Sequence, residues 1–133
     1  MKKAEYTVDF ASSVDKIWQV VTDNSNYAWR SDLSKIEVSG GGNSFVEYTK
    51  KGYPTEFEVT LKIPHERYEF NMKNSNMTGH WTGIFEKMNG RARVTFIEEV
   101  EVKGILKQLF VKSYLKSQQK RYAADLKKAL GEG

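Results

Sequence analysis

The order of hydrophobic periodicities along the chain constrains its fold more than any single motif. Residues 6–10 alternate apolar and polar side chains, the period of a half-buried strand. Residues 12–22 then combine a serine suited to cap a helix with apolar side chains on one helical face. Strand-like patterns continue to residue 102, and a long lysine-rich helix closes the chain. This order predicts a single α+β domain over residues 1–133, with one sheet wrapped around a helix.

The turn at Asn89-Gly90 sets the register of the clearest predicted hairpin. This dipeptide favours a two-residue turn in which both residues have positive φ. The resulting register pairs Trp81 with Glu98 and places both on an apolar face together with Phe85. A β-bulge would shift the assignment.

A second hairpin is predicted around residues 64–67. The strand before it has apolar side chains at every second position from residue 57 to residue 63. A four-residue loop pairs Leu61 with Phe70 and Val59 with Met72, so that these apolar side chains share one face.

The final helix, predicted from about Gly104 to Leu130, does not keep one apolar face. One stripe consists of Ile105, Leu106, Leu109 and Phe110. The other consists of Val111, Leu115, Gln118, Gln119, Tyr122, Leu126, Ala129 and Leu130. A straight helix cannot bury both stripes on one flat surface. Either the helix bends near residues 110–113, or its first turns cover something different from its last.

Composition and charge exclude several classes of site. The chain has no cysteine and only two histidines, without the spacing of a metal site, so we predict neither metal nor cofactor. The net charge of +4 comes from the final helix, where residues 103–128 hold eight basic residues and one acidic residue. Such a face is usually solvated, and it lacks the interleaved aromatics typical of nucleic-acid binding. We therefore expect no nucleic-acid partner, at most transient membrane contact, and a monomer or weak homodimer.

The N-terminal segment runs directly into a strand pattern and has no apolar signal sequence. No apolar run approaches the length of a membrane span. A soluble cytoplasmic protein is the expectation from these features.

Three segments carry a resemblance to a known family. Phe10-Ala11-Ser12 precedes a helix with Val14, Ile17 and Trp18, followed by Thr22-Asp23, Tyr27 and Trp29. This opening resembles that of the START-like, or SRPBCC, superfamily, in its polyketide cyclase/dehydrase and lipid-transport branch. Residues 81–86 and 93–96 resemble the last two strands of that family, and residues 114–130 resemble its terminal helix. The resemblance implies a helix-grip fold: a curved antiparallel sheet around the C-terminal helix, two short helices after the first strand, and an internal cavity. It implies no single activity.

Glu98 is the candidate catalytic residue. A carboxylate desolvated beside Trp81 would have a raised pKa and could act as a general acid or base. The alternative is that Glu98 lies at the sheet rim, or pairs with a group on the helix. Polar-tipped residues and aromatic walls extend the predicted site. The ligand-binding candidates are Trp29, Tyr48, Phe57, Val59, Leu61, Phe70, Trp81, Phe85, Phe96, Glu98, Phe110, Tyr114 and Gln118.

Three functions remain open from the sequence. The favoured one is binding of a hydrophobic small molecule, such as a lipid, an isoprenoid or an aromatic, polyketide-like compound. The second is a cyclase or dehydratase in which Glu98 moves a proton while Tyr48 or Tyr114 holds a carbonyl oxygen. The third is a protein-interaction module that uses a sheet edge or the lysine-rich helix.

Overall fold

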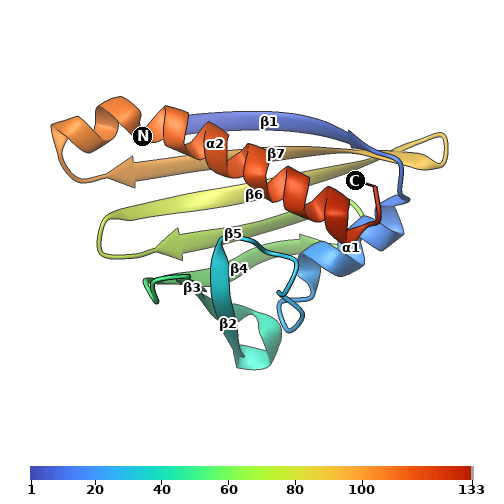
Figure 1. Ribbon diagram of the computed structural model, residues 1–133, viewed down its shortest axis with the longest axis horizontal. Coiled ribbons are helices and arrows are strands. Elements are labelled where there is room, and N and C mark those ends of the chain that lie inside the picture. The colour runs from blue at the N-terminus through green and yellow to red at the C-terminus, as the bar shows by residue number, and fades with distance from the viewer. Residues whose placement is uncertain (133) are drawn as a thin grey trace.

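One curved antiparallel sheet and a long helix lying across it form the framework of the protein (Figure 1). The computed structural model describes residues 1–132, except for the side chain of Leu106. Within this range seven strands follow the order β1-β7-β6-β5-β4-β3-β2. The strands are β1 (Lys2–Phe10), β2 (Leu33–Ser39), β3 (Ser44–Thr49), β4 (Pro54–Ile63), β5 (Arg67–Lys73), β6 (Met77–Met88) and β7 (Arg91–Val102). The helices are α1 (Val14–Thr22), the 3₁₀ turn η1 (Gly40–Gly42) and α2 (Ile105–Ala129).

The α+β, helix-grip fold class predicted from the sequence is confirmed. Helix α2 packs mainly on β1 and β7, and its C-terminal half also meets α1 (Figure 1). In the described chain one α-helix follows β1, where the resemblance implied two. Residues 24–32 form turns instead, in which Asp23 Oδ1 accepts from Ser25 N at 3.1 Å and Tyr27 O accepts from Arg30 N at 2.9 Å. The bond to the Asp23 side chain is of the kind that competes with helix formation.

The β6–β7 hairpin has the predicted register. Asn89 and Gly90 both have positive φ, at 43° and 81°, as the two-residue turn requires. Trp81 is therefore paired with Glu98, and no bulge interrupts the ladder between them and the turn. Local turn chemistry was sufficient to fix this part of the sheet.

The predicted β4–β5 register is wrong. The register shifts between Val59 and Leu61, so that Val59 pairs with Phe70 and Leu61 with Glu69. Such a bulge turns the side chains that follow it to the other face of the sheet. Leu61 is accordingly 37% exposed, whereas Phe57, before the bulge, is buried.

Helix α2 runs without interruption from Ile105 to Ala129, and its two stripes have different environments. Most of the second stripe is buried, with Val111, Leu115 and Leu126 at most 7% exposed, although Ala129 near its end is exposed. Ile105 and Leu109 in the first stripe are 79% and 69% exposed. The first turns of α2 therefore do not pack on the sheet as its last turns do. Within residues 1–132 neither helix combines the length and apolarity of a membrane span.

Candidate ligand-binding cavity

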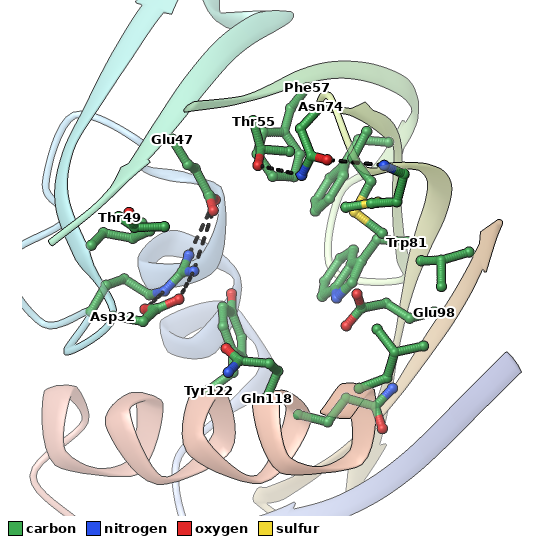
Figure 2. A pocket seen from close by; sticks show the side chains of 18 of the residues that line it. Asp32, Glu47, Thr49, Thr55, Phe57, Asn74, Trp81, Glu98, Gln118 and Tyr122 are labelled. Atoms are coloured by element: carbon green, nitrogen blue, oxygen red, sulfur yellow. Dashed lines mark hydrogen bonds and ion pairs between the residues drawn. The ribbon is translucent and has the colours of Figure 1, made fainter. Parts of the chain in front are cut away.

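A cavity of about 730 Å³ lies between the sheet and α2 (Figure 2). Most of its wall is aromatic or aliphatic. The aromatic side chains that line it are Tyr27, Trp29, Phe45, Tyr53, Phe57, Tyr68, Phe70, Trp81, Phe96, Phe110, Tyr114 and Tyr122. A cavity of this size and composition is typical of sites that enclose drug-sized organic molecules.

The aromatic wall is ordered by ring stacking. Phe70 stacks on Trp81 with ring centroids 4.7 Å apart, and Phe45 stacks on Phe57 at 4.8 Å. Gly83 leaves the space that the indole needs, because a Cβ there would lie 2.7 Å from Trp81 Cη2. The walls are thus positioned by neighbouring strands of the sheet before any ligand enters.

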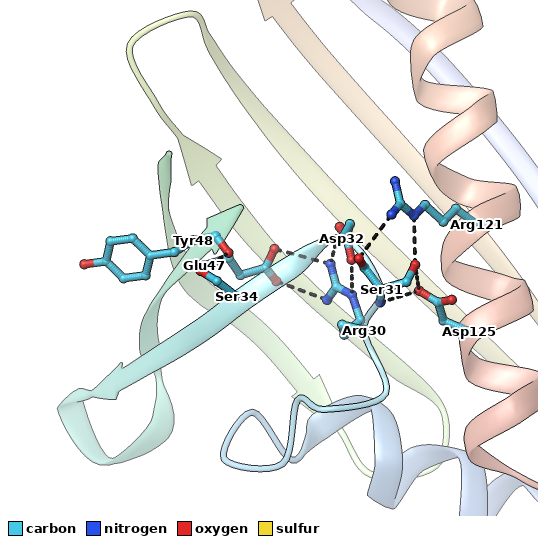
Figure 3. A network of polar contacts seen from close by, with 8 residues as sticks. All are labelled: Arg30, Ser31, Asp32, Ser34, Glu47, Tyr48, Arg121 and Asp125. Atoms are coloured by element: carbon cyan, nitrogen blue, oxygen red, sulfur yellow. Dashed lines mark hydrogen bonds and ion pairs between the residues drawn. The ribbon is translucent and has the colours of Figure 1, made fainter. Parts of the chain in front are cut away.

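A charged cluster occupies the opposite side of the cavity. Arg30 Nε and Nη2 donate to the two oxygens of Asp32, both at 3.1 Å. Its Nη1 and Nη2 donate to Glu47 at 3.3 and 3.4 Å (Figure 3). The guanidinium carbon also lies 4.9 Å from the ring centroid of Tyr122. Burial opposes the charge of Arg30, but the two carboxylates outweigh it and raise the pKa of the guanidinium. Burial raises the pKa of Glu47, while Arg30 opposes that rise.

A second group of contacts ties this segment to α2. Asp125, which is 8% exposed, accepts from the backbone N–H and the hydroxyl of Ser31 at 2.8 and 2.7 Å. Arg121 donates to the hydroxyl and the carbonyl oxygen of the same serine (Figure 3). The loop that carries Arg30 is therefore held between β3 and α2, and it closes one side of the cavity.

Glu98 extends from β7 into the cavity beside Trp81 (Figure 2). Its carboxylate forms no hydrogen bond or ion pair with any described residue. Burial raises the pKa of Glu98 to about 7, with the charge of Glu47 adding to the shift and Arg30 opposing it. β7 lies inside the sheet, between β1 and β6. Glu98 therefore does not lie at an edge of the sheet. Nor is it paired with a basic or hydroxyl group of α2, among the residues that the structure describes.

Replacing Glu98 by glutamine is expected to stabilise the protein at alkaline pH. The pKa of Glu98 is about 7 in the folded chain, against 4.5 for an ordinary glutamate. Because the folded chain holds this proton more tightly than the unfolded chain, the stability that Glu98 contributes is fully present below about pH 4.5. It is lost as the pH rises through about 7. Glu98→Gln should therefore unfold with a free energy about 2 kcal/mol higher than wild type at about pH 8, and with little difference at about pH 4. Urea denaturation at both pH values measures this.

Glu101→Gln, which removes a charge from the exposed face of the same strand, should show no such gain. Equal curves for wild type and Glu98→Gln at both pH values would contradict the raised pKa.

Most of the predicted binding residues meet at the cavity. Those that line it are Trp29, Phe57, Phe70, Trp81, Phe96, Glu98, Phe110, Tyr114 and Gln118. Phe110 and Tyr114 are 69% and 61% exposed although they line the cavity, which places them at its opening. A binding role for these residues stays a prediction.

Four predicted residues do not line the cavity. Tyr48 lies on the outer face of β3, where Lys35 Nζ lies 4.7 Å from its ring centroid, because Phe45 and Glu47 occupy the inner positions of that strand. Leu61 is turned outward by the β4 bulge. Val59 packs against the core without reaching the cavity. Phe85 packs edge-on against Trp18 at 5.1 Å, beneath α1.

Sequence reasoning missed the charged cluster of Arg30, Asp32 and Glu47. One signal was present, because Glu47 follows Phe45 by two positions and therefore shares its face in a regular strand. For Arg30 no periodic pattern exists, since it lies in turns whose path depends on β3 and α2.

An antiparallel sheet that grips a C-terminal helix around an apolar cavity defines the START-like class of proteins. The family model described as polyketide cyclase/dehydrase and lipid transport matches residues 1–131, so the chain belongs to this family. No curated protein sequence matches the chain.

Solved structures share the fold at low sequence identity. A START superfamily protein from Mycobacterium smegmatis superposes with a TM-score of 0.83 at 15% identity, covering 98% of this chain and 97% of that one. The di-domain aromatase/cyclase BexL of the BE-7585A biosynthetic pathway gives 0.81 at 15% identity, covering 98% of this chain and 47% of that one. Norcoclaurine synthase from Thalictrum flavum gives 0.76 at 14% identity, covering 98% and 94%. At these identities the likeness concerns the fold alone.

Proposed function

We propose that the protein binds a hydrophobic small molecule, of lipid, isoprenoid or aromatic character, in the cavity between the sheet and α2. The observation that carries the proposal is a cavity of about 730 Å³ whose walls are mainly aromatic and aliphatic. Burial of apolar ligand surface contributes about 25 cal/mol per Å², before the costs of ordering the ligand. Because the rings of Phe70 and Trp81 are already stacked on each other, the protein itself loses little conformational freedom when a ligand binds.

A neutral, environment-sensitive dye tests the cavity directly. Nile red should bind with a stoichiometry of about one, and its emission should shift to the blue as it leaves water. Gln118→Trp adds an indole at a position that lines the cavity and should abolish binding. Gln108→Trp adds the same group on an exposed position of the same helix and should leave binding unchanged. Equal dye binding by the two variants, or no stoichiometric binding by wild type, would overturn the proposal.

Mass spectrometry identifies the natural ligand. Native spectra of the freshly purified protein should show an added mass that is lost under denaturing conditions. The released compound then gives the ligand class.

A second candidate function is proton transfer by Glu98 on a bound carbonyl compound. It is favoured by the raised pKa of Glu98, about 7, because a general base works best when its pKa is near the working pH. Burial, and the charge of Glu98, also raise the pKa of Tyr114, which keeps that hydroxyl protonated and able to donate to an oxygen. The described residues provide no second acid or base bonded to Glu98, and this makes binding the first proposal.

Deuterium exchange separates the two functions. The protein should accelerate exchange next to the carbonyl of 2-tetralone in heavy water, with a rate that rises through about pH 7. Glu98→Gln should lose this acceleration and still bind Nile red. If wild type and Glu98→Gln exchange equally, Glu98 has no such catalytic role.

A further inference from the structure

The charges that line the cavity are predominantly acidic. Its lining includes the carboxylates of Asp23, Asp32, Glu47 and Glu98, and the cations of Arg30 and Lys107. Lys107 belongs to the exposed first turns of α2, where its Nζ donates to Asn76 Oδ1 at 2.9 Å. Apart from Arg30, the interior of the described cavity has no cation.

Arg30 is not available to an anionic ligand. Asp32 occupies one edge of its guanidinium with two hydrogen bonds at 3.1 Å, and Glu47 occupies another at 3.3 and 3.4 Å. Two carboxylates therefore surround one guanidinium, and this cluster has a negative net charge when both are ionised. An anionic ligand would have to displace one of them from a buried pair, at a large cost.

A second acceptor among the described residues that line the cavity, the side-chain oxygen of Gln119, also lacks a donor. The side chain of Gln119, which is 2% exposed, donates its Nε2 to the carbonyl oxygens of Ala4 and Phe96, at 3.0 and 3.4 Å. Because both partners are acceptors, the orientation of this amide is settled by its chemistry. Its Oε1 has no hydrogen-bond partner among the described residues. Two positions along the strand from Phe96, the Glu98 carboxylate is likewise without a donor.

We propose that the cavity selects hydrophobic molecules that carry a protonated amine, with the Glu98 carboxylate as the ionic partner. This inference rests on the proposed binding function and names the chemical class of its ligand. The aromatic walls take the apolar body, and the ammonium group supplies the donor that Glu98 lacks. Removal of water from the site strengthens this pair relative to one at the surface.

The proposal implies a pH dependence with a definite sign. The charged and titratable groups around Glu98 are Glu47 on β3, Arg30 in the loop before β2, and Tyr114 on α2. The Glu98 carboxyl is largely protonated in the empty cavity below about pH 7, and a bound ammonium favours its ionised form. Amines of this kind stay protonated to about pH 10. Amine affinity should therefore rise between about pH 6 and about pH 8, with release of a proton on binding.

Three probes of one shape test the selectivity. They are 2-(1-naphthyl)ethylamine, 2-(1-naphthyl)ethanol and 1-naphthaleneacetic acid, measured by isothermal titration calorimetry. At about pH 8 the amine should bind about ten-fold more tightly than the alcohol, and the acid most weakly. The affinity of the alcohol should not depend on pH.

Variants locate the effect at Glu98. Glu98→Gln should lower amine affinity about ten-fold and remove its pH dependence, and leave alcohol affinity within about two-fold. Glu101→Gln should change neither affinity. An unchanged alcohol affinity would show that the cavity of a variant is intact. The order of the three affinities is measured on the wild-type protein, so that test does not depend on the folding of any variant.

The outcomes separate the two proposals. If none of the three probes binds, the binding function fails, and the present inference fails with it. If the alcohol binds but the amine binds no more tightly, or the acid binds most tightly, amine selection is wrong and the binding function stands. Retention of the full amine preference in Glu98→Gln would also overturn the role of Glu98.

Discussion

Replacing Arg30 by methionine should lower the free energy of unfolding by about 3 to 5 kcal/mol at neutral pH. The side chains of Arg30 and Glu47 are only 13% and 14% exposed. Methionine keeps much of the volume of arginine but removes the cation, so Glu47 is left buried without its partner. The cost arises from that uncompensated carboxylate more than from the lost attraction.

Two further measurements make the Arg30 prediction specific. The double variant Arg30→Met/Glu47→Leu removes the stranded charge and should recover most of the lost stability. Arg121→Met is the matched control, because Arg121 is exposed and, among the described residues, bonds only to Ser31. It should cost about 1 kcal/mol or less. Urea denaturation measures all three. An Arg30→Met variant no less stable than Arg121→Met would show that the buried pair has no such role.

The Arg30→Met penalty should also depend on pH. Burial raises the pKa of Glu47, and loss of Arg30 removes the group that opposes this rise. The folded variant therefore holds its proton more tightly than the unfolded chain, so stability is lost as the pH increases. The difference between wild type and Arg30→Met should be smaller at about pH 4 than at about pH 8.

Truncation of Leu126 to alanine should cost about 2 to 5 kcal/mol. Leu126 is fully buried in the last turns of α2, within the core between the helix and the sheet. Its loss removes apolar burial and leaves a void that the surrounding side chains fill incompletely. Because these turns also carry Asp125, which binds Ser31, the variant should weaken the closure of the cavity as well.

Leu109 provides the matched control on the same helix. It is 69% exposed, and Leu109→Ala should change the free energy of unfolding by no more than about 0.5 kcal/mol. The comparison uses one residue type, one substitution and one helix, so helix propensity cancels. Equal losses for the two variants in urea denaturation would contradict the difference in packing between the first and last turns of α2.

The two halves of α2 also differ in their relation to the cavity. Its last turns are part of the core, whereas Phe110 and Tyr114 line the cavity from exposed positions. The stripe pattern of the sequence indicated two environments for this helix. It did not indicate that the first environment is the opening of a cavity, because exposure depends on where the sheet ends beneath the helix.

Features governed by local chemistry were predictable from the sequence. The Asn89-Gly90 turn determined the β6–β7 register, and with it the position of Glu98 opposite Trp81. The apolar period of residues 14–21 predicted α1 and its buried face. In each case the interactions that decide the structure join residues close together in the chain, so their pattern is visible in the sequence.

Features that depend on distant contacts were decided by the tertiary structure alone. The β4 bulge moved Leu61 out of the interior, although the strand pattern before it is regular. Arg30 meets Glu47 across 17 positions, and Ser31 meets Asp125 across 94. The hollow itself results from the curvature of the sheet and the distance at which α2 crosses it. A periodic pattern states which face of an element is apolar, whereas only the arrangement of all the elements determines whether that face meets another side chain or a cavity.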